Sequence, residues 1–158
     1  MKAPIDTIKI VIRDEAHLRA HLDDFLVPLD LALEWAGLRL AASARREGWE
    51  HFDFRAPRPV GKGGLARIRI WTRGDFWARR RGRTLPSHLI VGEKKPTRRL
   101  CVWGLWQGDG SFLLHTLYPG SAAPREIHDP ELALGEMPAA LKFWSSHAIV
   151  VGPSEWNA

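Results

Sequence analysis

The chain has 158 residues and a formal net charge of +5, with 45% hydrophobic and 26% charged residues, which is typical of a single globular domain covering residues 1–158. Its apolar runs are too short for a membrane-spanning helix, and its charged N-terminus does not resemble a signal peptide. The single cysteine, Cys101, excludes an internal disulfide and a multi-thiolate zinc site. We therefore expect a cytoplasmic protein that does not bind membranes, or one exported by a machine that does not read a signal peptide.

The first elements are predicted to be a strand and two helices. Isoleucines alternate with other residues over residues 5–13, which is the period of a half-buried strand. From Asp14 to residue 47 the apolar residues recur at helical spacing. Pro28 removes an amide donor within this stretch, so we expect it to divide into two helices, and Gly48 is a candidate for the residue that ends the second.

His17 and His21 lie four residues apart in the first predicted helix, a spacing that places two side chains on one face. A metal site would need a third ligand at a clear spacing, which the sequence does not offer. The HExxH and PCxxC motifs of zinc enzymes are also absent from the sequence. We therefore interpret both residues as exposed helix histidines and expect no metal and no cofactor.

Residues 51–66 are rich in Pro and Gly and have no sustained period, which predicts a loop. The glycines in this stretch do not match the spacing of a phosphate-binding loop. Residues 67–72 alternate apolar and polar or cationic side chains, which predicts a strand with one cationic face.

Positive charge is concentrated in residues 61–99, which we call the basic segment. It holds twelve Lys or Arg against two acids, whereas residues 1–60 hold nine against ten and residues 100–158 hold two against six. Such a density attracts RNA or another polyanion, or an acidic protein such as an inhibitor (immunity) protein. The alternative interpretation is a set of solvated loop charges. The residues expected to contact nucleic acid are Trp77, Arg79, Arg80, Arg81, Arg83, Lys94, Lys95, Arg98 and Arg99.

Three strand-like runs follow the arginine cluster, at residues 87–92, 99–106 and 111–117. Residues 107–110 contain two glycines that can supply positive φ, so we expect a hairpin turn there and an antiparallel meander of the three strands.

The C-terminal part is predicted to contain a loop at residues 119–130, a helix from Pro130 to about His147 and a short strand at residues 148–151. N-terminal helices packed on a mainly antiparallel sheet of about four to five strands make the predicted fold class α+β.

Histidine is the side chain that accepts and donates protons near neutral pH. His88 lies within the basic segment, between its two groups of cations. Two other candidate histidines lie beside hydroxyl groups. His115 is close to Thr116 and Tyr118, which are candidates with it, and His147 follows two serines. Cleavage of an RNA phosphodiester needs a base, an acid and groups that stabilise the charge of the phosphorane, and it requires no metal.

The segments HLIVGE, LHTLYPG and FWSSHAIV, and the architecture over roughly residues 14–151, resemble the metal-independent ribonuclease superfamily of barnase, the EndoU nucleases, colicin D and the RelE-type toxins. The resemblance implies a toxin-like RNA endonuclease. The roles it implies are general base for His88, general acid or its partner for His115, phosphate donor for Thr116 or Tyr118, and charge stabiliser for Arg98 or Arg99.

Strand alternation leaves open whether His88 and His115 meet in one groove. If Leu113 and Leu117 face the core, His115 points inward with them and away from Thr116. A one-residue bulge would reconcile the two histidines.

Two further interpretations remain open. Tryptophans in or beside the basic segment either stack bases or pack in the core; they are Trp71, Trp77, Trp103 and Trp106. The rival to the ribonuclease is a non-catalytic basic module, such as a phage or mobile-element accessory protein, that binds nucleic acid or an acidic protein. The two functions differ in whether His88 and a second histidine or hydroxyl lie within about 10 Å of each other among the arginines.

Overall fold

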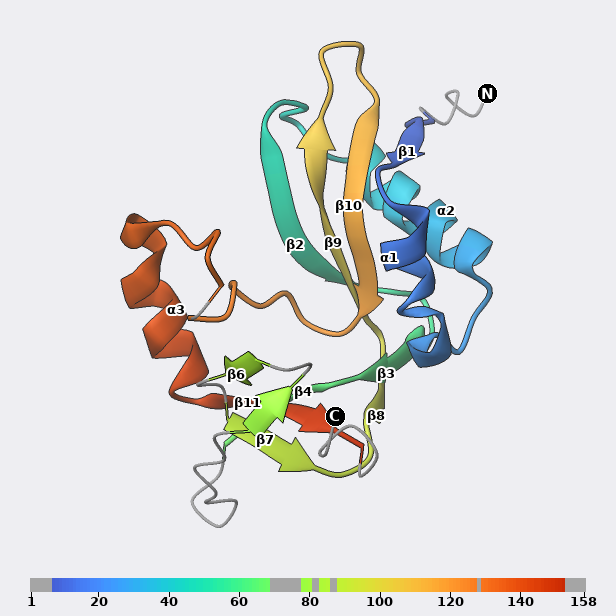
Figure 1. Ribbon diagram of the computed structural model, residues 1–158. Coiled ribbons are helices and arrows are strands. Elements are labelled where there is room, and N and C mark those ends of the chain that lie inside the picture. The colour runs from blue at the N-terminus through green and yellow to red at the C-terminus, as the bar shows by residue number, and fades with distance from the viewer. Residues whose placement is uncertain (1–6, 69–77, 81–82, 86–87, 128, 153–158) are drawn as a thin grey trace. The chain divides into compact units, whose positions relative to one another are not determined.

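A computed structural model describes residues 7–68, 78–80, 83–85, 88–127 and 129–152 (Figure 1). Two compact units can be distinguished, the first formed by Met1–Gly63 and Pro96–Ala122, the second by Gly64–Lys95 and Ala123–Ala158. The single domain expected from the length stays a prediction. None of the helices in the described ranges has the length and apolar character that crossing a membrane requires.

The first unit is built on a four-stranded sheet with the order β1-β10-β9-β2 (Figure 1). The strands are β1 (Ile10–Ile12), β10 (Phe112–Pro119), β9 (Arg99–Trp106) and β2 (Trp49–Arg55). β1 runs parallel to β10, whereas β9 pairs antiparallel with both β10 and β2. Together with the helices, this mainly antiparallel sheet confirms the α+β fold class.

The predicted hairpin between β9 and β10 is confirmed. Gly110 has a φ of +84°, and its N–H donates to the carbonyl of Gln107 at 3.0 Å. The Asp109 carboxylate accepts hydrogen bonds from the Ser111 hydroxyl at 2.6 Å and from the Ser111 N–H at 3.0 Å. Both hydrogen bonds lower the pKa of Asp109 below its ordinary value, and the one from the hydroxyl has the larger effect.

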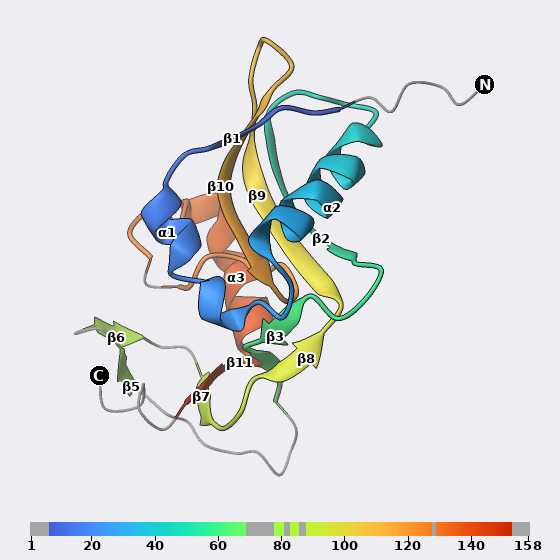
Figure 2. The ribbon, with the colours of Figure 1, turned by 90° about the vertical axis from the view of Figure 1, so that its right-hand side faces the viewer.

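The division of the N-terminal helical region at Pro28 is also confirmed. The helices are α1 (Glu15–Arg19), the short 3-10 helix η1 (Leu22–Asp24) and α2 (Leu29–Ala41). Ala32, Ala36 and Leu40 recur every four residues on α2 and are buried in the hydrophobic core. Helix α2 lies over one face of the sheet (Figure 2). The helix ends at Ala41, so the prediction that Gly48 ends it was wrong; Gly48 has a φ of +75° and directly precedes β2.

The loop predicted for residues 51–66 was wrong, because this stretch contains most of β2 and two short strands, β3 (Gly61–Gly63) and β4 (Leu65–Arg67). Phe52 and Phe54 alternate with polar residues and pack against the core, which makes β2 a half-buried strand. β3 pairs with β8 (Lys95–Thr97).

The three-strand meander was wrong in part, since only β9 and β10 pair as expected. The third predicted strand, β7 (His88–Val91), belongs to the second unit, in a sheet of order β4-β11-β7. There it runs parallel to β11 (His147–Val151), while β2 occupies the remaining edge of β9. Both β7 and β9 thus pair with strands that are distant in sequence, β11 and β2, instead of with each other. The second unit also contains β5 (Ala78–Arg80) paired with β6 (Arg83–Leu85).

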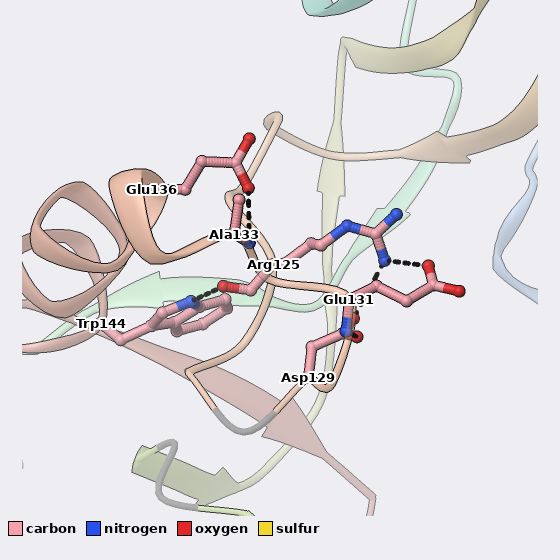
Figure 3. Close-up of polar contacts among 6 residues, drawn as sticks. All are labelled: Arg125, Asp129, Glu131, Ala133, Glu136 and Trp144. Atoms are coloured by element: carbon pink, nitrogen blue, oxygen red, sulfur yellow. Dashed lines mark hydrogen bonds and ion pairs between the residues drawn. The ribbon is translucent and has the colours of Figure 1, made fainter.

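The C-terminal helix begins later than predicted, with the 3-10 turn η3 (Leu134–Glu136) leading into α3 (Met137–Trp144). Polar contacts hold the preceding segment in place (Figure 3). Nη1 of Arg125 lies 3.1 Å from Asp129 and 3.0 Å from Glu131, and its carbonyl accepts the indole N–H of Trp144 at 3.1 Å. These contacts stabilise the turn at residues 130–131, and Pro138 lies in the first turn of the helix.

Candidate functional site

The sheet of the first unit has a second face, opposite α2, where the polar and aromatic side chains of its strands gather. The register fixes its members, because the half-buried Phe52 and the buried Val102 and Leu117 lie in line on the α2 side and their neighbours point away. We call this surface the aromatic face; its residues are Val11, Arg13, Trp49, His51, Asp53, Arg55, Arg99, Cys101, Trp103, Leu105, Leu113, His115, Thr116 and Tyr118.

A β-bulge in β10 places three predicted site residues on this face. The register with β9 shifts between Leu114 and Thr116, so His115 is the extra residue. His115, Thr116 and Tyr118 consequently share the aromatic face, while Leu114 and Leu117 point to the core. Leu113 and Leu117 point to opposite faces because the bulge reverses the alternation between them, so the condition under which His115 would point inward is not met.

Aromatic rings surround the His115 imidazole. Its centroid lies 4.6 Å from the Trp49 ring, in an edge-on arrangement, and 5.6 Å from the Trp103 ring. The two indoles are 6.1 Å apart, and the His51 ring lies 5.7 Å from Trp103. These four rings come from three adjacent strands and form one continuous cluster.

Arg13 provides a cation at the edge of this cluster. The N–H of Arg13 donates to the carbonyl of Leu114 at 3.0 Å, which extends the pairing of β1 to the bulge. Nη1 of Arg13 lies 2.7 Å from Nδ1 of His115. Because a guanidinium only donates, Nδ1 must accept, and the imidazole is in its neutral form with the proton on Nε2.

Helix α1 adds a second histidine to the same region. Asp14 caps the helix by accepting the N–H of His17 at 3.1 Å, and Nε2 of His17 lies 3.2 Å from the hydroxyl of Thr116. The His21 ring lies 5.2 Å from His17 and 5.9 Å from Tyr118. His17 is exposed as expected, but His21 is half-buried, and both contact β10 residues rather than solvent alone. The four-residue spacing in the sequence was the signal for this pair.

Around Cys101, the aromatic face consists of a buried thiol and an ion pair. Cys101 is fully buried, and this burial raises the pKa of its thiol from 9.0 to about 12, an effect that a hydrogen bond with Tyr118 partly opposes and the charge of Asp53 reinforces. Asp53 pairs with Arg99 at 3.2 Å and accepts the N–H of Ala122 at 2.8 Å. The thiol is therefore unsuited to nucleophilic chemistry, and the charge of Arg99 is already balanced.

Arg98, the other predicted charge stabiliser, has a structural role. Its guanidinium donates to the carbonyls of Ala56 at 3.0 Å and Pro57 at 2.6 Å, which secures the chain just after β2. Arg99 is the first residue of β9 and Arg98 precedes it, and their guanidinium groups contact Asp53 and the carbonyls that follow β2 rather than His115.

His147 and His88 belong to the second unit. The His147 ring stacks on Phe143 with centroids 4.0 Å apart, and its Nδ1 lies 3.0 Å from the Phe143 carbonyl. The backbone of His88 pairs with Ala148 in the same sheet, while its side chain lies outside the described residues. The meeting of His88 and His115 in one groove therefore stays a prediction.

Much of the predicted nucleic-acid contact set also stays a prediction. Trp77 and Arg81 lie outside the described residues, as do the side chains of Arg79, Arg80 and Arg83. Lys94 is half-buried and Lys95 is exposed, both in the second unit. Within the described ranges, no group of three or more His, Cys, Asp or Glu residues is placed to hold a metal ion.

Comparison of the chain with protein-family models, with curated proteins and with solved structures gives no match. The resemblance to metal-independent ribonucleases stays a prediction. The function is therefore inferred from the chemistry of the aromatic face.

Proposed function

We propose that the chain cleaves RNA without a metal, at the edge of the aromatic face where Arg13, His17, His115 and Thr116 come together. The observation that carries this proposal is the bulge at His115, which gathers two imidazoles and a hydroxyl from α1 and β10 with the guanidinium of the residue that follows β1. Bulges often re-aim side chains beside active sites. Two imidazoles and a cation are the groups that metal-free cleavage of RNA needs.

The reaction is an internal transfer at phosphorus. A base removes the proton of the 2′-hydroxyl, the 2′-oxygen forms a bond to phosphorus, and the bond from phosphorus to the 5′-oxygen breaks. An acid delivers a proton to the leaving 5′-oxygen. The products are a 2′,3′-cyclic phosphate and a 5′-hydroxyl, and the charge of the phosphorane between them is stabilised by nearby donors.

The contacts suggest how the roles are divided. A phosphate is a stronger acceptor for a guanidinium than an imidazole nitrogen, so a bound phosphate draws Arg13 away from His115. Nδ1 of His115 can then take a proton, which turns a neutral ring into an imidazolium that can act as the acid. His17, whose Nε2 faces the Thr116 hydroxyl, is left as the base, a role that the resemblance gives to His88.

A second candidate function, binding of nucleic acid without cleavage, is favoured by the same contact. In the structure as described, the hydrogen bond from Arg13 keeps His115 neutral, and a neutral imidazole is a donor but a poor acid. The two candidates differ in whether phosphate binding releases His115 to be protonated.

Incubation of the purified protein with a defined RNA in excess chelator tests the proposal. We expect fragments that end in 2′,3′-cyclic phosphate and begin with 5′-hydroxyl, identified by mass spectrometry. Binding of the RNA with no fragments would favour the non-catalytic candidate.

A further inference from the structure

Trp49 is exposed although it is the bulkiest type of side chain. Of the five tryptophans in the described part of the chain, it alone is exposed, with 57% of its surface accessible; Trp106 and Trp144 are 5% accessible. Leaving an indole in water forgoes the free energy of burying it. An exposed indole inside a ring cluster therefore indicates a surface that binds a partner.

The position of Trp49 suggests what that partner is. The indole is in ring contact with His115, and His115 is held by Arg13. In a nucleotide, a single ribose separates the base from its phosphate. A phosphate at Arg13 would thus bring the adjoining base within reach of the Trp49 ring.

The charge of the aromatic face fits a polyanion. Its members include three arginines and one carboxylate, and that carboxylate, Asp53, is balanced by Arg99 and by the N–H of Ala122. A cluster of aromatic rings with a cation at its edge matches the two parts of a nucleotide, a base with a π face and an anionic phosphate.

The same geometry selects the form of the nucleic acid. Bases in a duplex are stacked on each other, so their faces are not available to a protein ring, whereas unpaired bases stack readily on aromatic side chains. Trp49 is the first residue of β2, an edge strand of the sheet, and its ring lies among side chains of two neighbouring strands.

We propose that Trp49 stacks on the base of an unpaired nucleotide whose phosphate is held by Arg13, which makes single-stranded RNA the substrate class. This inference rests on the proposed function, because it places the stacked base next to the phosphodiester that His17 and His115 would cleave. The stacking itself requires only binding, so the two proposals are testable apart.

The test measures binding of a fluorescent 2′-O-methyl RNA, which cannot be cleaved because it lacks the 2′-hydroxyl. The probe is offered as a single strand and as a duplex with its complement. We expect Trp49→Leu to weaken single-strand binding roughly 10-fold, since stacking on one aromatic residue contributes about 1 to 3 kcal/mol, and Trp49→Phe to restore most of it. Leu38→Ala removes another exposed apolar side chain, from α2, and should change nothing.

The outcomes separate the two proposals. Equal affinity of wild type and Trp49→Leu for the single strand, equal affinity for single strand and duplex, or absence of binding by the wild type would overturn the stacking. If the substitution weakens binding while unmodified RNA remains intact, the stacking stands and the cleavage does not. If unmodified RNA is cleaved and Trp49→Leu cleaves and binds like the wild type, the cleavage stands and the stacking does not.

Discussion

Nη1 of Arg13 lies 2.7 Å from Nδ1 of His115, although the two residues are 102 positions apart in the chain. The parallel pairing of β1 with β10 creates this relationship, because it ends where the bulge begins. Under the proposed function, a phosphate that binds Arg13 would replace this imidazole as the acceptor of the guanidinium. Exchange of one acceptor for the other would allow the His115 imidazole to become charged and would hold the phosphate at Arg13.

Substitution of Arg13 tests this exchange. We expect Arg13→Gln to weaken binding of single-stranded RNA roughly 10- to 100-fold and to reduce the slope of log affinity against log salt by about 1, because one charged contact to phosphate is lost. Arg45→Gln is the matched control, since Arg45 is exposed and forms a local ion pair with Glu47. An unchanged salt slope for Arg13→Gln would mean that its guanidinium does not contact phosphate.

The hydroxyl of Thr116 is expected to position His17. Thr116→Val keeps the shape of this buried side chain but removes the hydrogen-bond partner of Nε2. We expect kcat for RNA cleavage to fall about 5-fold, which corresponds to one hydrogen bond of about 1 kcal/mol, with an altered acidic limb of the pH profile. Thr116→Ser should restore both. A fall in thermal stability without a change in the pH profile would indicate a purely structural role.

The buried thiol of Cys101 predicts a loss of stability in alkali. Its pKa is about 12 in the folded protein, above the ordinary 9.0 expected in the unfolded chain. Between these pH values the unfolded chain loses the thiol proton while the folded protein keeps it, so the free energy of unfolding falls as pH rises from about 9 to 12. Urea unfolding at several pH values should show a steeper alkaline loss for wild type than for Cys101→Ala. Equal slopes would contradict the account.

The thiol should also be protected from reagents. A water-soluble disulfide reagent at pH 8 is expected to modify Cys101 only after denaturation, since the side chain is fully buried and protonated. Rapid modification of the native protein would show that β9 is accessible at this point.

Gly104 is required by close packing. A Cβ added there would lie 2.4 Å from both the Leu113 carbonyl oxygen and the Phe112 ring, so the ring covers the glycine. We expect Gly104→Ala to destabilise the protein by about 1 to 3 kcal/mol in urea unfolding. Gly108→Ala is the control, because a Cβ there meets nothing within 4 Å. Equal stability of the two variants would show that the Phe112 ring moves aside at little cost.

Local patterns were sufficient to predict the elements whose signals are local. The alternation in β9 and β10 and the glycines between them predict the hairpin, and Pro28 predicts the break between α1 and α2. Fold class follows from such elements. The strand β2 carried the same alternation, but the density of Pro and Gly just after it favoured a loop.

Pairing and register were beyond the sequence patterns, because they depend on contacts between distant segments. The parallel pairs of β1 with β10 and of β7 with β11 leave no local signal. The same holds for the bulge, which decides that His115 joins Thr116 and Tyr118. His17 was missed as a site residue because its partner, Thr116, is 99 positions away.

The measurement that tests the central claim most directly is cleavage of an end-labelled single-stranded RNA in excess chelator by wild type, His17→Ala and His115→Ala, with folding of each variant checked by circular dichroism. The account predicts cyclic-phosphate fragments from the wild type and a loss of rate of about 100-fold or more in each variant, since each removes a proton-transfer group. Absence of fragments from the wild type would contradict it. So would cleavage by the folded His115→Ala protein at the rate of the wild type.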